Sequence, residues 1–238
     1  MTSRQRLAID AWTTVDPERE AHGIRSRQMR AGPRLGKRAV DLALACPILA
    51  LSSPLMLMAY ILIRLTSRGP ALIRQTRIGQ HERPFAMFKF RTMRLDADDT
   101  ALRRMNILEL AGNTDPGTSD GAFKPDADPR VTKVGRLLRR FSVDELPQLF
   151  NVLSGEMSLV GPRPSLPWEV KLYTPAQRMR HACLPGMTGL WQVSGRNRLP
   201  MPQMLRLDLV YARSWSLSLD LWILCRTPGA VLFDRTVR

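Results

Sequence analysis

A single uncharged segment near the N-terminus constrains the fold of this chain more than any other feature. Residues 42–63 contain no charged side chain, and basic residues lie on both sides of them: Arg34, Lys37 and Arg38 before, and Arg64, Arg68, Arg74 and Arg77 after. At about 1.5 Å per residue, a helix of this length spans a hydrocarbon core of roughly 30 Å. The segment begins too far from the first residue for an ordinary cleaved signal peptide, so we expect a retained, membrane-inserted helix.

The middle of this segment predicts a change of direction. Pro54 follows Ser52 and Ser53, and a proline removes a backbone donor and favours a kink in any helix. Lys and Arg favour the cytoplasmic side of a membrane, and neither flank here is plainly less basic. We therefore interpret residues 34–68 as a re-entrant helix-break-helix, with its break at Ser53 and Pro54, that returns both flanks to one face. A single kinked crossing and a buried core helix remain alternatives.

The charge of the chain requires an anionic partner. Its 36 Lys and Arg outnumber 21 Asp and Glu, which gives a formal net charge of +15. Nucleic acid, acidic lipid headgroups and phosphorylated substrates all meet that requirement. The three widely spaced cysteines, Cys46, Cys183 and Cys225, form neither a disulfide framework nor a zinc knuckle, and they favour a body in a reducing, cytosolic environment.

The rest of the chain predicts an α+β, mostly helical fold, with a cytosolic domain over residues 69–238. Residues 71–78 and 85–90 are typical of two short strands around a turn. Helical spacing marks 94–110 and 130–140, whereas the Gly- and Pro-containing stretch 111–129 predicts a loop. Residues 1–33 predict a mobile basic arm. Residues 204–233 are apolar but carry charges, which argue for amphipathic helices on the membrane interface and against a second crossing: Asp208, Arg213, Asp220 and Arg226.

Two adjacent carboxylates, Asp144 and Glu145, are the candidate chemical centre. Ser142 and Glu145 also fit a capping box, which accounts for Glu145 without any catalytic role. An aspartate at a helix start is kept ionised by the helix dipole and by nearby arginines, as a carboxylate nucleophile requires. Arg139, Arg140 and Arg163 would neutralise charge that develops on a phosphate. Spacing alone favours an ordinary solvated helix start over catalysis.

A series of motifs in a fixed order decides between these interpretations. The chain from about residue 37 to 233 resembles the bacterial sugar transferase family, the monotopic phosphoglycosyl transferases that begin exopolysaccharide, capsule and O-antigen assembly. The segments that carry the resemblance are Lys37-Arg38-x-x-Asp41, Ser53-Pro54, Arg77-Ile78-Gly79, Lys89-Phe90-Arg91-Thr92-Met93, Asp128-Pro129-Arg130-Val131, Asp144-Glu145 with Pro162-Arg163-Pro164, the run from Pro185 to Asn197, and Trp215-Ser216-Leu217.

This resemblance implies roles for the candidate residues. Asp144 would attack the β-phosphate of a UDP-sugar and release UMP, and Glu145 would bind or orient Mg²⁺. The phosphate-binding arginines would be Arg139, Arg163 and Arg196. Polyprenyl phosphate (undecaprenyl phosphate) would then accept the phosphosugar at the cytoplasmic face of the bacterial inner membrane. Membrane lipids are implied as partners, and downstream glycosyltransferases are possible ones.

A rival interpretation comes from the net charge alone. A basic, membrane-tethered protein that binds nucleic acid or anionic lipid without catalysis would bind less tightly as salt is raised and would tolerate Asp144→Asn. The sequence contains no zinc-finger spacing, RNA-binding aromatic signature or separate helix-turn-helix, so we expect no nucleic-acid partner. No residue distinguishes glucose, galactose and N-acetylated donors.

Overall fold

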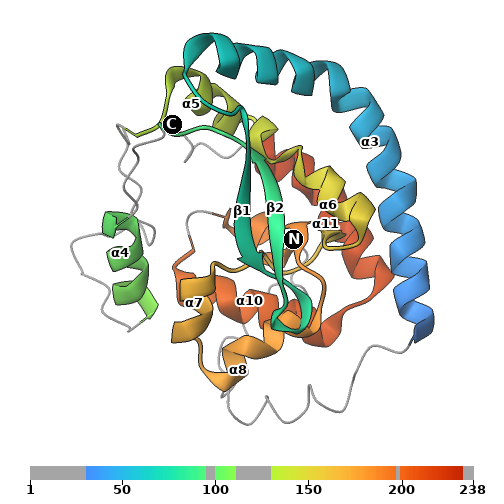
Figure 1. Ribbon diagram of the computed structural model, residues 1–238. Helices are drawn as coiled ribbons and strands as arrows, with labels where there is room; N and C mark the ends of the chain where they lie inside the picture. The colour runs from blue at the N-terminus through green and yellow to red at the C-terminus, as the bar shows by residue number, and fades with distance from the viewer. Residues whose placement is uncertain (1–30, 95–99, 111–129, 197–198, 233–238) are drawn as a thin grey trace.

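The computed structural model describes residues 31–94, 100–110, 130–196 and 199–232 (Figure 1). The predicted basic arm, up to residue 30, and the predicted loop 111–129 lie outside these residues. The elements are the helices α3 (Ala31–Thr66), α4 (Thr100–Leu110), α5 (Lys133–Arg140), α6 (Gln148–Ser154), α7 (Pro167–Leu172), α8 (Pro175–Arg178), α9 (Leu190–Ser194), α10 (Met201–Ser214) and α11 (Leu217–Leu232), the 3-10 turns η1 (Gln80–Glu82), η2 (Val143–Glu145) and η3 (Met179–Ala182), and the strands β1 (Leu72–Ile78), β2 (Pro84–Phe90), β3 (Ser158–Val160) and β4 (Gly186–Thr188).

Helix α3 presents two different faces. Its inner side carries buried residues near each end of the helix, Lys37, Asp41 and Ala45 and then Ala59 and Ile63, with partly buried Leu49, Ser52 and Met56 between them at the same three- or four-residue spacing. The opposite side is apolar and exposed, with Leu51 82% and Leu65 78% accessible. Within the described residues, one helix, Leu35–Thr66, is long and apolar enough to cross a membrane by length and composition. A helix with one stripe on the protein and an apolar outer face indicates membrane association.

At Ser53 and Pro54, where the sequence predicts a break, the structure has a bent but continuous helix (Figure 1). Helix α3 continues through Pro47 and Pro54, and Figure 1 shows it arching around the rest of the protein. Pro54 has no N–H to donate to the carbonyl of Ala50, four residues earlier. The hydroxyl of Ser53 donates to that carbonyl at 2.8 Å instead, so the helix bends without losing the hydrogen bond. The return of both ends to one membrane face stays a prediction.

The predicted hairpin is confirmed, and a second, unpredicted sheet accompanies it. Strands β1 and β2 pair antiparallel from Leu72 opposite Phe90 to Ile78 opposite Pro84. Strands β3 and β4 pair in parallel, which joins Ser158 to Gly186. A Cβ on Gly186 would lie 2.0 Å from the amide nitrogen of Gly161, so the two backbones approach this closely only because that residue is glycine.

Two apolar clusters lie under α3, and each holds one half of the helix against the rest of the protein. The larger one joins the first half of the helix at Ala45 to Leu149 of α6, Tyr211 of α10 and Ile223 of α11. The second lies under the later half and includes Ala59, Ile63, Phe90, Leu138 and Val143. Because Leu138 belongs to α5 and Val143 to η2, the later half of α3 packs directly on the segment that carries the two candidate acids.

Two of the four charges named in the C-terminal helices, both aspartates, have another role than the one predicted for them. Asp208 of α10 is 1% exposed and Asp220 of α11 is 3% exposed. Asp208 forms an ion pair with Arg180, and Asp220 pairs with Lys37 of α3 at 2.7 Å. These carboxylates therefore face the protein interior, and they do not mark a polar face of an interfacial helix.

Candidate active site

The two candidate acids lie in η2, a short 3-10 turn that follows α5. Asp144 is 3% exposed, and Glu145 is partly buried. Ser142 adopts a left-handed conformation, with φ 54°, and its side chain makes no capping hydrogen bond. The hydroxyl of Ser142 instead accepts a hydrogen bond from Nη2 of Arg196 at 2.9 Å. The capping box predicted from Ser142 and Glu145 is therefore wrong. Arg196 instead contacts Ser142, the residue two positions before Asp144.

Lys89 of β2 is the direct partner of the candidate nucleophile. Its Nζ lies 2.7 Å from Oδ2 of Asp144, and the two side chains are 23% and 4% exposed. A buried carboxylate without a cation would carry a large desolvation cost. Lys89 was not among the predicted site residues, although it opens one of the motifs that carry the family resemblance. Its position on the hairpin, 55 residues before Asp144, left no local signal for the pairing.

Glu145 and Arg163 act on the same buried cation, Arg77 of β1. The guanidinium of Arg77 donates to the carbonyl of Pro164 at 3.1 Å. Burial and the charge of Arg163 lower the pKa of Arg77 to about 10, against the opposing effect of the carboxylates of Glu169 and Glu145. Arg77 thus contacts the Pro-Arg-Pro segment directly and lies within electrostatic range of Glu145.

The Pro-Arg-Pro segment is held by its backbone and leaves Arg163 exposed. Nη2 of Arg180, a residue of η3, donates to the carbonyl of Arg163 at 2.7 Å. The same guanidinium pairs with Asp208 and donates to Ser165 at 2.7 Å and Tyr173 at 3.2 Å. Arg180 is 4% exposed. A buried network therefore fixes the loop, while the side chain of Arg163 reaches solvent, where an anionic substrate can meet it.

The remaining predicted residues divide into two groups. Arg139 of α5 donates from Nε to the hydroxyl of Thr92 at 2.9 Å, at the end of the hairpin that also carries Lys89. Arg196 is held between Ser142 and the carbonyl of Ala230 in α11, 3.0 Å from Nη1. Both arginines are thereby tied to elements that adjoin the two acids. Ser53 and Pro54 lie apart from this site, on the exposed side of α3.

The donor set fits a metal that arrives with a phosphate ligand better than a resident metal. No group of three or more His, Cys, Asp or Glu in the described part of the chain is arranged to hold an ion. Mg²⁺ commonly takes only one or two carboxylates and completes its shell with substrate phosphates and water. Glu145 is partly exposed and adjoins the cationic side chains, so it can supply such a ligand, whereas Asp144 is engaged by Lys89.

Comparison with known proteins gives this arrangement a family. The model of the family described as bacterial sugar transferase matches residues 32–234. The chain is 41% identical over 202 residues to the uncharacterized sugar transferase EpsL of Bacillus subtilis, with 85% of this chain and 90% of that protein covered. It is 39% identical over 204 residues to the exopolysaccharide production protein ExoY of Rhizobium meliloti, with 84% and 87% covered.

A longer relative has a named activity. The chain is 39% identical over 212 residues to the undecaprenyl-phosphate galactose phosphotransferase of Salmonella typhimurium, covering 88% of this chain but 43% of that protein. The chain thus spans most of the length of EpsL and ExoY and less than half of the longer relative. Because the family match extends over most of its residues, this chain belongs to the bacterial sugar transferase family.

Proposed function

We propose that this protein transfers a phosphosugar from a UDP-sugar to polyprenyl phosphate at the cytoplasmic face of the bacterial inner membrane, as the first step of exopolysaccharide, capsule or O-antigen assembly. One observation carries the proposal. A buried carboxylate, Asp144, is oriented by Lys89 on a turn that packs under an apolar-faced helix. The names of relatives as undecaprenyl-phosphate galactose and glucose phosphotransferases support the donor and acceptor classes.

In the first step, a carboxylate oxygen of Asp144 attacks the β-phosphorus of the UDP-sugar. The bond between this phosphorus and the oxygen that bridges the two phosphates breaks, and its electron pair leaves with UMP. The phosphosugar remains on Asp144 as a mixed anhydride. Arg139, Arg163 and Arg196 neutralise the charge that develops on the leaving phosphate.

Glu145 is the residue that would hold Mg²⁺ in this proposal. The ion would supply further neutralisation of the phosphate oxygens. Lys89 keeps the charge of Asp144 compensated in the resting protein, at 2.7 Å from Oδ2, and restrains the direction from which the carboxylate meets the donor.

In the second step, a phosphate oxygen of polyprenyl phosphate attacks the same phosphorus and frees Asp144. The products are polyprenyl-diphospho-sugar and the regenerated carboxylate, so the scheme is ping-pong. This order explains why the site packs under α3, because the acceptor brings its phosphate only to the membrane surface while the donor arrives from solution. The re-entrant course of residues 34–68 would keep both flanks on the donor side.

The test is UMP release by the detergent-solubilised full chain, given Mg²⁺, polyprenyl phosphate and UDP-sugars that carry glucose, galactose or N-acetylated sugars. We expect one donor to yield UMP, and Asp144→Asn to lower turnover by roughly three orders of magnitude or more. Glu82→Gln is the matched control, because Glu82 is an exposed acid paired only with Arg178 and His181 among the described residues. Without acceptor, the wild-type protein should release UMP once per site.

Removal of the metal and membrane insertion complete the test. Chelation should stop UMP release and added Mg²⁺ should restore it, while Asp144→Asn should insert into vesicles as the wild-type protein does. Wild-type turnover in Asp144→Asn would refute the assignment of the nucleophile. Absence of UMP from every donor, with lipid binding that weakens as salt rises and survives Asp144→Asn, would favour the non-catalytic binding protein.

A further inference from the structure

A cavity of about 560 Å³ lies beside the C-terminal end of α3, apart from the acids of the active site. It is enclosed by the turn after α3, the segment that follows β2, and the start of α5. Its volume is in the range of small-ligand sites. None of the residues that line it is Asp144, Glu145, Lys89 or one of the three phosphate-binding arginines assigned above. The cavity is therefore lined by a set of residues separate from those assigned to the reaction.

The lining of this cavity is cationic. It includes Arg68, Arg91, Arg94 and Lys133, and its described lining contains no carboxylate. Three of these side chains are exposed, whereas Arg91 is only 5% exposed. Four positive charges around one hollow repel each other, and an anion relieves that repulsion.

Arg91 gives the second, independent indication of a ligand. Its Nη2 donates to the hydroxyl of Ser67 at 2.8 Å and to the carbonyl of Ser67 at 3.1 Å. Its Nη1 is buried and has no hydrogen-bond partner within the described structure. A buried guanidinium nitrogen without an acceptor is costly. An anion in the cavity would give the side chain the acceptor that it lacks.

The start of α5 supplies backbone donors to the same hollow. Thr132 is the N-cap, its hydroxyl accepts from the amide of Gly135 at 2.9 Å, and no acid stands in the first turn. The amides of Lys133 and Val134, which line the cavity, have no acceptor within the helix because they precede its first hydrogen-bonded turn. The positive end of the helix dipole adds to the field of the four cations.

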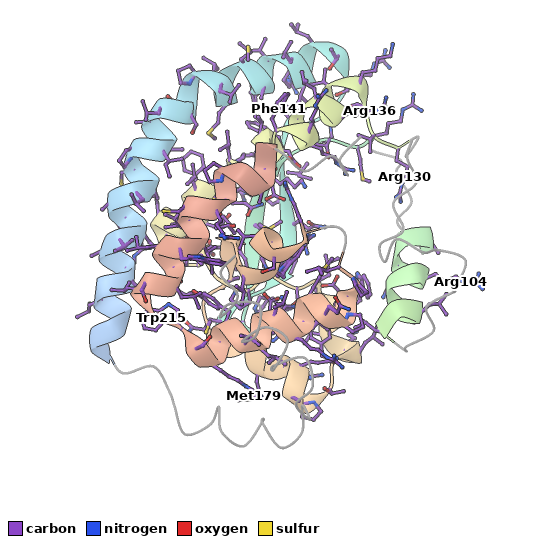
Figure 2. All side chains as sticks on the ribbon, turned by 180° about the vertical axis from the view of Figure 1, so that it is seen from behind. Arg104, Arg130, Arg136, Phe141, Met179 and Trp215 are labelled. Carbon is purple, nitrogen blue, oxygen red and sulfur yellow. The ribbon has the colours of Figure 1, made fainter. Side chains whose placement is uncertain are left out.

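The surroundings of this cavity are suited to a lipid interface. Exposed apolar side chains occur on the elements that line it, with Leu65 on α3 78%, Leu137 on α5 52% and Phe141 directly after α5 48% accessible. Figure 2 shows Phe141 and Arg136 at the end of the protein where α3 arches over α5. Apolar side chains that alternate with cations are typical of a surface that meets headgroups and acyl chains together.

We propose that this cavity binds the phosphate group of a membrane lipid through residues other than those assigned to the reaction at Asp144, as a site that a lipid phosphate occupies before or apart from the reaction. Arg68, Arg91, Arg94 and Lys133 would hold the phosphate oxygens with the first amides of α5. Two lipids offer this group: a polyprenyl phosphate, which is the acceptor if the proposed function holds, and an anionic phospholipid. Thr92 connects the two sites, because its carbonyl accepts from Thr132 at 3.0 Å and its hydroxyl from Arg139 at 2.9 Å.

The experiment measures binding to the detergent-solubilised full chain by calorimetric titration. The probes are farnesyl phosphate, farnesol as its neutral counterpart, and dioctanoyl phosphatidylglycerol. Charge reversal at two exposed lining residues, Arg94→Glu and Lys133→Glu, should weaken phosphate-dependent binding about tenfold or more each. Arg136→Glu is the matched control, because it makes the same change on α5 at an exposed residue outside the lining. Arg91→Lys tests the buried nitrogen with the charge retained.

The probe that binds less tightly to the lining variants identifies the lipid that supplies the phosphate. Weaker binding of farnesyl phosphate alone, with a raised KM for polyprenyl phosphate and an unchanged KM for the donor, assigns the site to the acceptor. Weaker binding of phosphatidylglycerol assigns it to a phospholipid. Equal losses in Arg136→Glu, or no loss in Arg94→Glu and Lys133→Glu, would overturn the proposal. Binding is read without turnover, so failure of UMP release would refute the proposed function and leave this site intact.

Discussion

The ion pair between Lys37 and Asp220 fastens the membrane helix to the rest of the protein, and Lys37→Met tests it. Nζ of Lys37 donates to Oδ2 of Asp220 at 2.7 Å, to the carbonyl of Val160 at 2.9 Å and to Tyr211 at 3.2 Å. The side chains of the pair are 8% and 5% exposed. Truncation at Lys37 therefore leaves a buried carboxylate without its cation.

The expected loss of stability depends on the hydrogen bonds that Asp220 keeps in Lys37→Met. Removal of one partner of a buried pair costs about 3–5 kcal/mol. Asp220 still accepts from Tyr211 at 2.8 Å and from the indole of Trp215 at 3.0 Å. Burial and the charge of Asp220 raise the pKa of Tyr211 well above its ordinary value, so it remains a donor. We therefore expect the lower end, about 3 kcal/mol, which lowers Tm by about 6–12 °C in a chain of this length.

The assay is thermal unfolding of the detergent-solubilised protein in a double-mutant cycle with Asp220→Leu. The double variant should lose less than the sum of the single ones, because it leaves no unpaired buried charge. The control pair is Arg178 and Glu82, at 3.2 Å with both side chains 40% exposed, where truncation should cost about 0–1 kcal/mol. If Lys37→Met lowers Tm no more than Arg178→Met does, the buried pair does not fasten α3.

Two further changes probe the protein around the site. Burial and the charge of Arg180 lower the pKa of His181 from 6.5 to about 3. Below pH 6.5 the unfolded chain therefore binds a proton at His181 that the folded protein does not bind, so the free energy of unfolding falls, by about 2 kcal/mol at pH 5. The Tm of His181→Gln should depend less on pH than that of the wild-type protein. An identical pH dependence of Tm would contradict the assignment. A Cβ on Gly135 would lie 2.1 Å from the carbonyl of Thr92, whereas the atom nearest to a Cβ on Gly36 would be 3.5 Å away. Gly135→Ala should therefore lower the free energy of unfolding by about 1–3 kcal/mol, and Gly36→Ala should not. The Tm values of the two variants check this.

Local patterns in the sequence predicted the parts of the fold that local forces determine. The apolar segment with basic flanks predicted the long helix, because length and lack of charge are local properties of the sequence. The hairpin followed from two short strand patterns around a turn. Ser53 and Pro54 predicted a change of direction; the helix continues through Pro54, where the hydroxyl of Ser53 donates to the carbonyl of Ala50, and the re-entrant course stays a prediction. A proline removes a donor, and a neighbouring side chain can replace it.

The pairings that build the site lay beyond such patterns. Lys89 meets Asp144, and Arg180 meets Asp208, across separations that only the tertiary fold closes. The Ser142 prediction failed for the related reason that its left-handed backbone turns the hydroxyl toward Arg196, and tertiary contact overrode a local capping signal. The order of the family motifs identified Asp144 and Glu145 as a pair, but no spacing could reveal which cation faces which acid.

The packing of α3 sets where the chemistry can occur. Polar contacts fix the first part of the helix, where Asp41 accepts from the hydroxyl of Ser158 at 2.9 Å and from the amide of Leu159 at 3.0 Å. Apolar packing fixes the later part, where Ile63 shares a cluster with Val143, the residue before Asp144. A helix held at both ends cannot tilt without moving η2. In the proposed function, the depth at which α3 inserts would therefore determine the height of Asp144 above the lipid, and the phosphate of the acceptor would have to reach that height to react.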